Sequence, residues 1–224
     1  EAGITFEVMV HFGTLLSVIW VFGGDIMRLL RNFSREKQER HFVFMLFLGI
    51  IPTGIMGILF GDIFEKFYES SVITGFMLLI TGAILITLSK IRPGNKSEQD
   101  VKPLDAFLIS IAQGFAIIPG ISRSGSTITS ALWRGLDRPT AVRYYFLVSV
   151  PVILGVTLMQ LKDMSEVGFS ALSGGVIAGT AAAFVSGLFA IRFFINLLNA
   201  GRFHYFAYYC WVVGLVVIGL GILF

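Results

Sequence analysis

The chain has 224 residues, of which 55% are hydrophobic and only 14% are charged. Soluble domains carry about 25% charged residues, so this composition, with a mean hydropathy of +0.83, excludes a cytosolic enzyme, a disordered protein and a disulfide scaffold. The apolar runs are continuous and longer than the alternating segments of about ten residues in membrane β-barrels. The sequence therefore predicts an all-α polytopic membrane protein. Its net charge of +3 becomes informative only once the basic residues are placed.

Six apolar stretches are each close to the roughly 20 residues that a helix needs to cross the hydrocarbon core. In chain order they are Ile4–Gly23, Phe42–Phe60, Val72–Ser89, Tyr144–Gln160, Gly174–Ile191 and Phe206–Phe224. Basic residues gather in four connections, which span 28–40, 90–102, 134–143 and 192–202, whereas the other two connections hold one each. The positive-inside rule places the four basic connections in the cytoplasm and both chain ends outside.

A seventh stretch, Ala106–Trp133, lies between two basic connections, so both of its ends are expected in the cytoplasm. Its 28 residues are too few for two crossings, and its centre, PGISRSGST from Pro119 to Thr127, is polar and rich in glycine. We expect a re-entrant helix–loop–helix that dips to mid-membrane, where irregular backbone is tolerated only inside protein or beside a water-filled cavity. The alternative is one ordinary span, kinked at proline, with a mistaken orientation.

A polar linker, residues 90–105, divides the single membrane domain 1–224 into two parts. The first half-repeat, 1–89, holds three spans, and the second, 106–224, holds the re-entrant pair and three spans. A further re-entrant pair ahead of Ile4 would complete an inverted repeat, an architecture that places sites near the membrane midplane. No strong internal sequence identity supports this repeat.

Arg123 is the main functional candidate, because an arginine at membrane depth costs at least a few kcal/mol unless it has a partner. Its neighbours are small or carry hydroxyls: Gly120, Ser122, Ser124, Gly125, Ser126 and Thr127. Backbone amides that open a helix and a guanidinium fork beside them together bind phosphate. We therefore expect a site for a phosphate or diphosphate headgroup. The alternatives are helix packing through Ser and Gly and an arginine that reaches the interface.

Three further polar residues within or near the spans have two interpretations each. Glu7 and His11 are four residues apart, so they share one helix face. In the first interpretation they are a buried hydrogen-bonded pair, with a neutral carboxyl, that only stabilises packing. In the second they are a general acid/base pair or a cation ligand beside the phosphate. Gln113, six residues before Pro119, serves either in helix packing or as a polar group in the cavity.

The segment from Gln113 to Thr127, QGFAIIPGISRSGST, resembles the second signature of the bacterial undecaprenyl-pyrophosphate phosphatases, the bacitracin-resistance membrane enzymes. The Pro-Gly-x-Ser-Arg-Ser-Gly-x-Thr core carries the resemblance. Phe6-Glu-Val, the basic connections and the Phe-Leu-Val-Ser-Val-Pro151 segment are also similar to the family, so that the resemblance covers essentially the whole chain. It implies six membrane spans and two re-entrant helix pairs arranged as inverted repeats, which agrees with the count from charge and length.

The resemblance also implies an activity, which is removal of the terminal phosphate from a C55 isoprenyl diphosphate during recycling of the cell-wall lipid carrier. The expected site is open to the external or periplasmic face of the bacterial plasma membrane. The expected partners are the isoprenyl diphosphate lipid and the bilayer; a homodimer is left open, and no nucleic acid is expected. The implied cofactor is a divalent cation, Mg²⁺ or Ca²⁺.

The matching motif assigns roles to individual residues. Arg123 would hold the phosphates and stabilise charge on the transferred phosphoryl group. Ser122 would donate a hydrogen bond to the same group. Glu7 would be a buried acid near the metal or the phosphates, and it is the weakest of these transfers. The substrate-binding residues would be Ser124, Gly125, Thr127, Gly120 and Gln113.

One departure from the family matters for activity. The family's first signature is a Glu-rich stretch that ends in Pro-x-Ser-Ser-Thr-Gly-His and supplies carboxylates and the candidate nucleophile, and no such segment lies between Glu1 and Phe6. We therefore expect the 224 residues alone to release little or no phosphate. The alternative function is a membrane transporter or channel that binds an anion at a re-entrant loop. Release of inorganic phosphate distinguishes the two.

Overall fold

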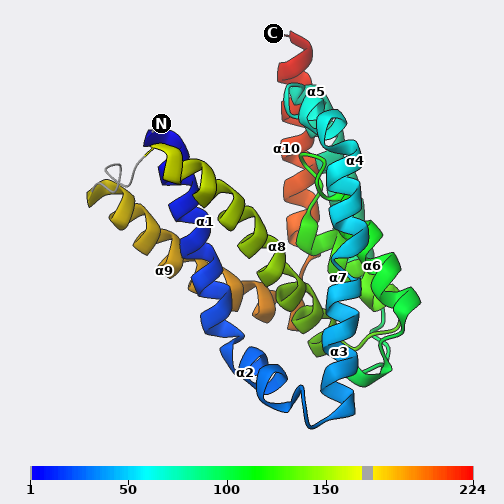
Figure 1. The fold of residues 1–224 in the computed structure, drawn as a ribbon. Coiled ribbons are helices and arrows are strands. Elements are labelled where there is room, and N and C mark those ends of the chain that lie inside the picture. The colour runs from blue at the N-terminus through cyan, green and yellow to red at the C-terminus, as the bar shows by residue number, and fades with distance from the viewer. Residues whose placement is uncertain (1, 168–173, 224) are drawn as a thin grey trace. The chain divides into compact units, whose positions relative to one another are not determined.

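The computed structural model describes the backbone of residues 2–167 and 174–223, and the side chains of these ranges except 2–4, 7, 65, 156 and 158–167. In these residues the fold is helical and contains no strand, which confirms the all-α prediction (Figure 1). The helices are α1 (Ala2–Val21), α2 (Gly23–Asn32), α3 (Lys37–Leu48), α4 (Ile51–Tyr68), α5 (Ser71–Lys90), α6 (Pro103–Phe115), α7 (Arg123–Trp133), α8 (Arg138–Val167), α9 (Gly174–Asn199) and α10 (His204–Leu223), with a short 3₁₀ turn, η1 (Glu98–Asp100).

Four helical stretches of the described residues are long and apolar enough to cross a membrane: Lys37–Phe64, Ser71–Lys90, Gly174–Asn199 and His204–Leu223. The pair Val8–Val21 and Gly23–Asn32, bent by 68°, makes a fifth if it is one span. Five of the predicted spans correspond to these stretches, which confirms a multi-pass membrane protein. The predicted span Tyr144–Gln160 lies within α8, and part of it falls on side chains outside the described set. A total of six spans therefore stays a prediction.

The chain divides into two compact units, each with residues from both sides of the linker. One consists of Glu1–Arg35 and Phe146–Asn196, and the other of Glu36–Tyr145 and Leu197–Phe224. In the first unit α1 and α9 approach closely at small residues: a Cβ on Gly13 would lie 2.5 Å from the Thr180 carbonyl oxygen. Such small-residue packing replaces the hydrophobic driving force that is missing between helices in lipid. The predicted half-repeats, 1–89 and 106–224, remain a prediction.

The second unit contains the segment with the phosphate motif, which is held by α4 and α5, and α10 packs against α5. Helices α5 and α10 pack along much of their length (Figure 1), and the Trp211 indole lies over Gly82 and donates a hydrogen bond to the Leu79 carbonyl, 3.0 Å away. Helix α6 packs against α4, and α7 packs against α5. The pair α6–α7 therefore lies on a frame of longer helices.

The stretch Ala106–Trp133 is a helix–loop–helix and not one continuous rod. Helix α6 has 13 residues and α7 has 11, so at about 1.5 Å per residue each is shorter than the roughly 30 Å hydrocarbon core. The two ends of the pair also meet. The amide of Lys96, ahead of α6, donates to the Gly135 carbonyl after α7 (3.1 Å), and the Asp137 amide donates to the Lys96 carbonyl (3.0 Å). The chain thus leaves the pair where it entered, as the re-entrant interpretation requires.

Candidate phosphate-binding turn

The turn between α6 and α7 is held in place by one threonine of α5. The Thr81 hydroxyl donates to the Gly120 carbonyl (2.7 Å) and accepts from the Ser122 amide (3.0 Å). Gly120 has a φ of 91°, and a Cβ there would lie 2.5 Å from the Thr74 carbonyl oxygen. Only glycine fits this conformation without strain. The Pro-Gly of the motif therefore makes a fixed turn that positions Ser122 at the start of α7.

Ser122 is the N-cap of α7. Its Oγ accepts from the Gly125 amide at 3.1 Å, and it lies 3.4 Å from the Ser124 Oγ. A Cβ on Gly125 would lie 3.0 Å from the Ser122 Oγ and 3.1 Å from a Leu85 methyl carbon, so a larger residue here would require these side chains to shift. The amides of Arg123 and Ser124 have no acceptor among the described residues. Two N–H groups at the positive end of a helix are thus free for an anion.

Arg123 begins α7, and its side chain is half-buried. Among the residues that the structure describes, its guanidinium makes neither a hydrogen bond nor an ion pair. A guanidinium keeps its charge at any physiological pH and offers five donors in a fork that matches phosphate oxygens. The turn therefore combines a cation, two backbone amides and the hydroxyls of Ser122 and Ser124 within one short segment, which is the chemistry of a phosphate site.

Two of the predicted binding residues use their polar groups inside the protein. Thr127 is fully buried, and its hydroxyl donates to the Arg123 carbonyl (2.7 Å), within α7 itself. Gln113 is buried between α6 and α4, where its Nε2 lies 3.4 Å from the Thr53 Oγ1 as a donor. Thr53 in turn is hydrogen-bonded to Ser110. This geometry gives both residues a packing role, and contact with substrate stays a prediction for each.

Glu7 and His11 lie on α1, in the other compact unit. The Glu7 side chain falls outside the described set, and the His11 side chain is exposed. The described residues contain no group of three or more His, Cys, Asp or Glu side chains that could hold a metal ion. The turn itself offers no carboxylate, the ligand that Mg²⁺ and Ca²⁺ prefer. The described residues thus contain no assembled site for the implied cation, which stays a prediction.

Sequence reasoning missed Thr81 and the buried carboxylate of Asp105. Thr81 gives no signal because it is one of several hydroxyl residues in an apolar helix. Asp105 did have a sequence signal, because an acid three residues after the N-cap position of a helix is typical of a capping box. In the structure its carboxylate accepts a hydrogen bond from the Lys102 amide at 3.0 Å. Its carboxylate also binds Lys96 Nζ (3.0 Å) and Arg134 Nε (2.7 Å), which joins the two ends of the α6–α7 pair.

The pKa of Asp105 lies below its ordinary value. Burial alone would raise the pKa, but the hydrogen bonds from the Lys102 amide, Lys96 and Arg134 favour the charged form more strongly. The carboxylate is therefore ionised throughout the physiological range, although it is fully buried.

Comparison with known proteins assigns the chain to one family. The model of the bacitracin resistance protein BacA matches residues 1–216. Among similar proteins, the undecaprenyl-diphosphatase of Halothermothrix orenii is 44% identical over 222 residues, 99% of this chain and 85% of that protein. That of Alkaliphilus metalliredigens is 40% identical and covers 94% of this chain and 82% of its own length. The undecaprenyl-diphosphatase of Methanosphaera stadtmanae is 34% identical, over 99% of this chain and 86% of that protein. The chain belongs to the BacA bacitracin-resistance family.

Proposed function

We propose that this protein is an integral-membrane phosphatase that hydrolyses undecaprenyl diphosphate to undecaprenyl phosphate and inorganic phosphate. The observation that carries the proposal is the Arg123 guanidinium, which has no partner among the described residues and stands beside two free amides at the start of α7. The relatives named above are undecaprenyl-diphosphatases. Hydrolysis of this substrate recycles the lipid carrier of cell-wall synthesis and underlies resistance to bacitracin.

The turn contributes binding and charge stabilisation to the reaction. The hydrolysis consumes one water molecule: an oxygen nucleophile forms a bond to the terminal phosphorus, the bond from that phosphorus to the bridging oxygen breaks, and undecaprenyl phosphate leaves, with inorganic phosphate as the second product. Negative charge on the transferred phosphoryl group and the leaving oxygen is stabilised by the Arg123 fork and by the amides of Arg123 and Ser124. Ser122 and Ser124 add hydroxyl donors, Gly120 lets the backbone adopt this turn, and Gly125 leaves room for the Ser122 hydroxyl. The attacking group is not assigned to any described residue.

The expected setting is the bacterial plasma membrane, with six spans and a re-entrant α6–α7 pair whose turn reaches a site open to the external face. Support comes from the short lengths of α6 and α7 and from the hydrogen bonds that join Lys96 to Gly135 and Asp137. The lipid substrate enters from the bilayer. A divalent cation, with Glu7 as a buried acid near it or near the phosphates, belongs to the proposal through the family resemblance. The oligomeric state is left open, with a homodimer as one option.

Replacement of Arg123 tests the function. The 224-residue chain, and the same chain extended at its N-terminus by a relative's first signature, are placed in lipid nanodiscs with farnesyl diphosphate. We expect both to bind the substrate and the extended chain to release phosphate. Arg123→Ala should lower that release by about 10³-fold or more, the range for an arginine on a transferred phosphoryl group. Arg123→Lys keeps the charge but loses the fork, so its rate should be intermediate.

The control is Arg92→Ala, which removes an exposed arginine of the linker and should leave the rate unchanged. The thermal midpoint of Arg123→Ala should also match that of the parent, because its guanidinium makes no bond to the described residues. Substrate binding without phosphate release in the extended chain would favour an anion carrier. Full activity in Arg123→Ala would contradict the proposed site.

A further inference from the structure

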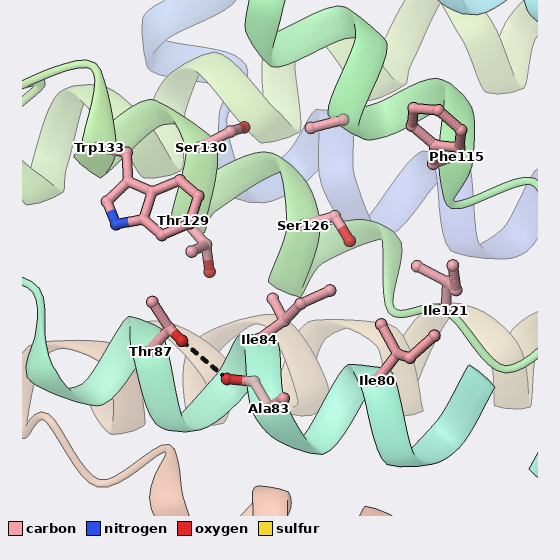
Figure 2. A pocket seen from close by; sticks show the side chains of 11 residues that line it. Ile80, Ala83, Ile84, Thr87, Phe115, Ile121, Ser126, Thr129, Ser130 and Trp133 are labelled. Atoms are coloured by element: carbon pink, nitrogen blue, oxygen red, sulfur yellow. Dashed lines mark hydrogen bonds between the residues drawn. The ribbon is translucent and has the colours of Figure 1, made fainter. Parts of the chain in front are cut away.

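A groove beside the phosphate-binding turn lies between α5 and the α6–α7 pair, and we call it the α5–α7 groove. Figure 2 shows its lining, which consists of Ile80, Ala83, Ile84, Thr87, Ala112, Phe115, Ile121, Ser126, Thr129, Ser130 and Trp133. Its volume of about 470 Å³ is within the range of small-molecule sites. It adjoins the turn directly, since Ile121 precedes the N-cap Ser122 and Ser126 lies in the first turn of α7.

Two hydroxyls in this apolar groove have no hydrogen-bond partner. Ser126 is 7% exposed and Thr129 is 4% exposed, and neither hydroxyl finds an acceptor or donor among the described residues. Three residues apart, they share one face of α7, and Figure 2 shows both oxygens pointing into the space between α7 and α5. Neighbouring hydroxyls behave differently: Thr87 donates to the Ala83 carbonyl (2.8 Å) and Ser130 to the Thr127 carbonyl (2.8 Å).

Unpaired buried hydroxyls are uncommon because each gives up its bonds to water without replacement. Their presence in a groove that is otherwise lined by isoleucine, phenylalanine and tryptophan points to a ligand that is apolar yet accepts weak hydrogen bonds. A saturated chain does not meet this description, because it would cover both hydroxyls and leave them unpaired. A prenyl chain does, because each isoprene unit carries a carbon–carbon double bond, whose π electrons accept an O–H group weakly, by analogy with aromatic faces that accept N–H groups.

We propose that the α5–α7 groove binds the first isoprene units of the lipid diphosphate, and that Ser126 and Thr129 select an unsaturated chain over a saturated one. This inference rests on the proposed function, since it needs the diphosphate at the Arg123 turn. The two hydroxyls are separated by about 4.5 Å along the helix axis, comparable with the repeat of an extended prenyl chain. Each hydroxyl then donates to a neighbouring double bond, and Trp133 and Phe115 lie at the exposed rim.

Two ligands with the same headgroup isolate the contribution of the chain. Farnesyl methylenediphosphonate resists hydrolysis, and its hexahydro analogue lacks the double bonds. Equilibrium binding of each to the chain in nanodiscs gives the ratio of the two dissociation constants. We expect the farnesyl ligand to bind at least about fivefold more tightly, since each of the two weak hydrogen bonds is worth roughly two- to fivefold. In Ser126→Ala/Thr129→Val the ratio should fall to about one, because prenyl binding weakens while saturated-chain binding strengthens.

Matched variants separate the free hydroxyls from the shape of the groove. Thr129→Ser keeps a hydroxyl and should keep the parent ratio. Thr87→Val removes a hydroxyl of the same groove that is already bonded to its own helix, so the ratio should again be unchanged. A ratio of one in the parent chain, or a parent-like ratio in the double variant, would overturn this inference.

Failure of the inference is distinguishable from failure of the proposed function. Arg123→Ala should weaken both ligands, and inorganic diphosphate, by the same factor and leave the ratio of the two chains unchanged. If neither ligand binds the parent chain, or if Arg123→Ala binds both as well as the parent does, the proposed diphosphate site is wrong and the inference with it. If both bind through Arg123 without chain preference, only the inference is wrong.

Discussion

At the scale of single residues, the candidate site depends on one hydroxyl that never needs to touch substrate. Thr81 Oγ1 joins α5 to the turn by two hydrogen bonds, to the Gly120 carbonyl and the Ser122 amide. Thr81 is only 3% exposed. Thr81→Val would therefore leave the Gly120 carbonyl and the Ser122 amide without this partner, at a cost of about 1–3 kcal/mol in the stability of the turn. We expect diphosphate binding to weaken by about tenfold or more, measured with farnesyl methylenediphosphonate.

The conservative variant decides whether Thr81 acts by position. Thr81→Ser keeps the hydroxyl and should restore binding to within about twofold of the parent. Ser89→Ala, on the same helix and outside the groove, removes a hydroxyl that bonds within α5 and serves as the control for loss of a hydroxyl. Equal binding by Thr81→Val and the parent would mean that the turn holds its shape without α5.

At the scale of elements, the α6–α7 pair is closed at its base by a buried carboxylate. Asp105 is fully buried, whereas its partners Lys96 and Arg134 are about one-third exposed. Asp105→Asn should therefore lower the unfolding free energy by about 1–3 kcal/mol, less than the loss of a completely buried pair because solvent screens the partners. Glu98→Gln neutralises an acid that pairs with the more exposed Arg143 and should cost about 0–1 kcal/mol.

The pH dependence of this effect has a definite sign. Because folding lowers the pKa of Asp105, its stabilisation is complete above the ordinary aspartate pKa of about 3.9. It is lost as the pH falls through the lowered value. The difference in thermal midpoint between the parent and Asp105→Asn, measured in detergent, should thus be constant near pH 7 and shrink in acid below about pH 4. A difference that grows in acid would assign the stabilisation to another group.

The sequence was sufficient for elements whose signal is local and insufficient for contacts made across the fold. Continuous apolar runs predicted the long helices, and the polar centre of Ala106–Trp133 predicted a break that the structure places between Phe115 and Arg123. The Ser122 cap and the Gly120 turn follow from local chemistry. Thr81 and the unpaired hydroxyls of the α5–α7 groove depend on which helix packs beside which, and side-chain periodicity carries no such information.

Gln113 illustrates the same limit from the opposite direction. A polar residue in an apolar helix indicates that it has a hydrogen-bond partner. The sequence did not determine whether that partner is another helix or a group in the substrate cavity. The structure provides Thr53 of α4 as a partner. The position of a neighbouring helix supplies this partner, and nothing within α6 determines it.

At the scale of the whole molecule, the re-entrant topology makes a prediction that no single helix makes. If α6 and α7 enter and leave by the same membrane face, cysteines introduced before α6 and after α7 are both accessible to a reagent in the cytoplasm. In a Cys210→Ala background, we expect Gln99→Cys and Pro139→Cys, both at exposed positions, to be labelled by a membrane-impermeant maleimide only in inside-out vesicles. Glu69→Cys, in the weakly basic connection between α4 and α5, should be labelled only on intact cells.

The pairing of the two flanking positions is what makes the labelling decisive. A single kinked span would put Gln99→Cys and Pro139→Cys on opposite sides, and reaction from opposite sides would contradict the re-entrant pair whatever the orientation of the rest. Reaction of both from the same side agrees with the hydrogen bonds of Lys96 to Gly135 and Asp137, which hold the two ends together. The Arg123 turn, at the far end of two short helices, then lies at membrane depth, where an unpaired guanidinium needs an anion.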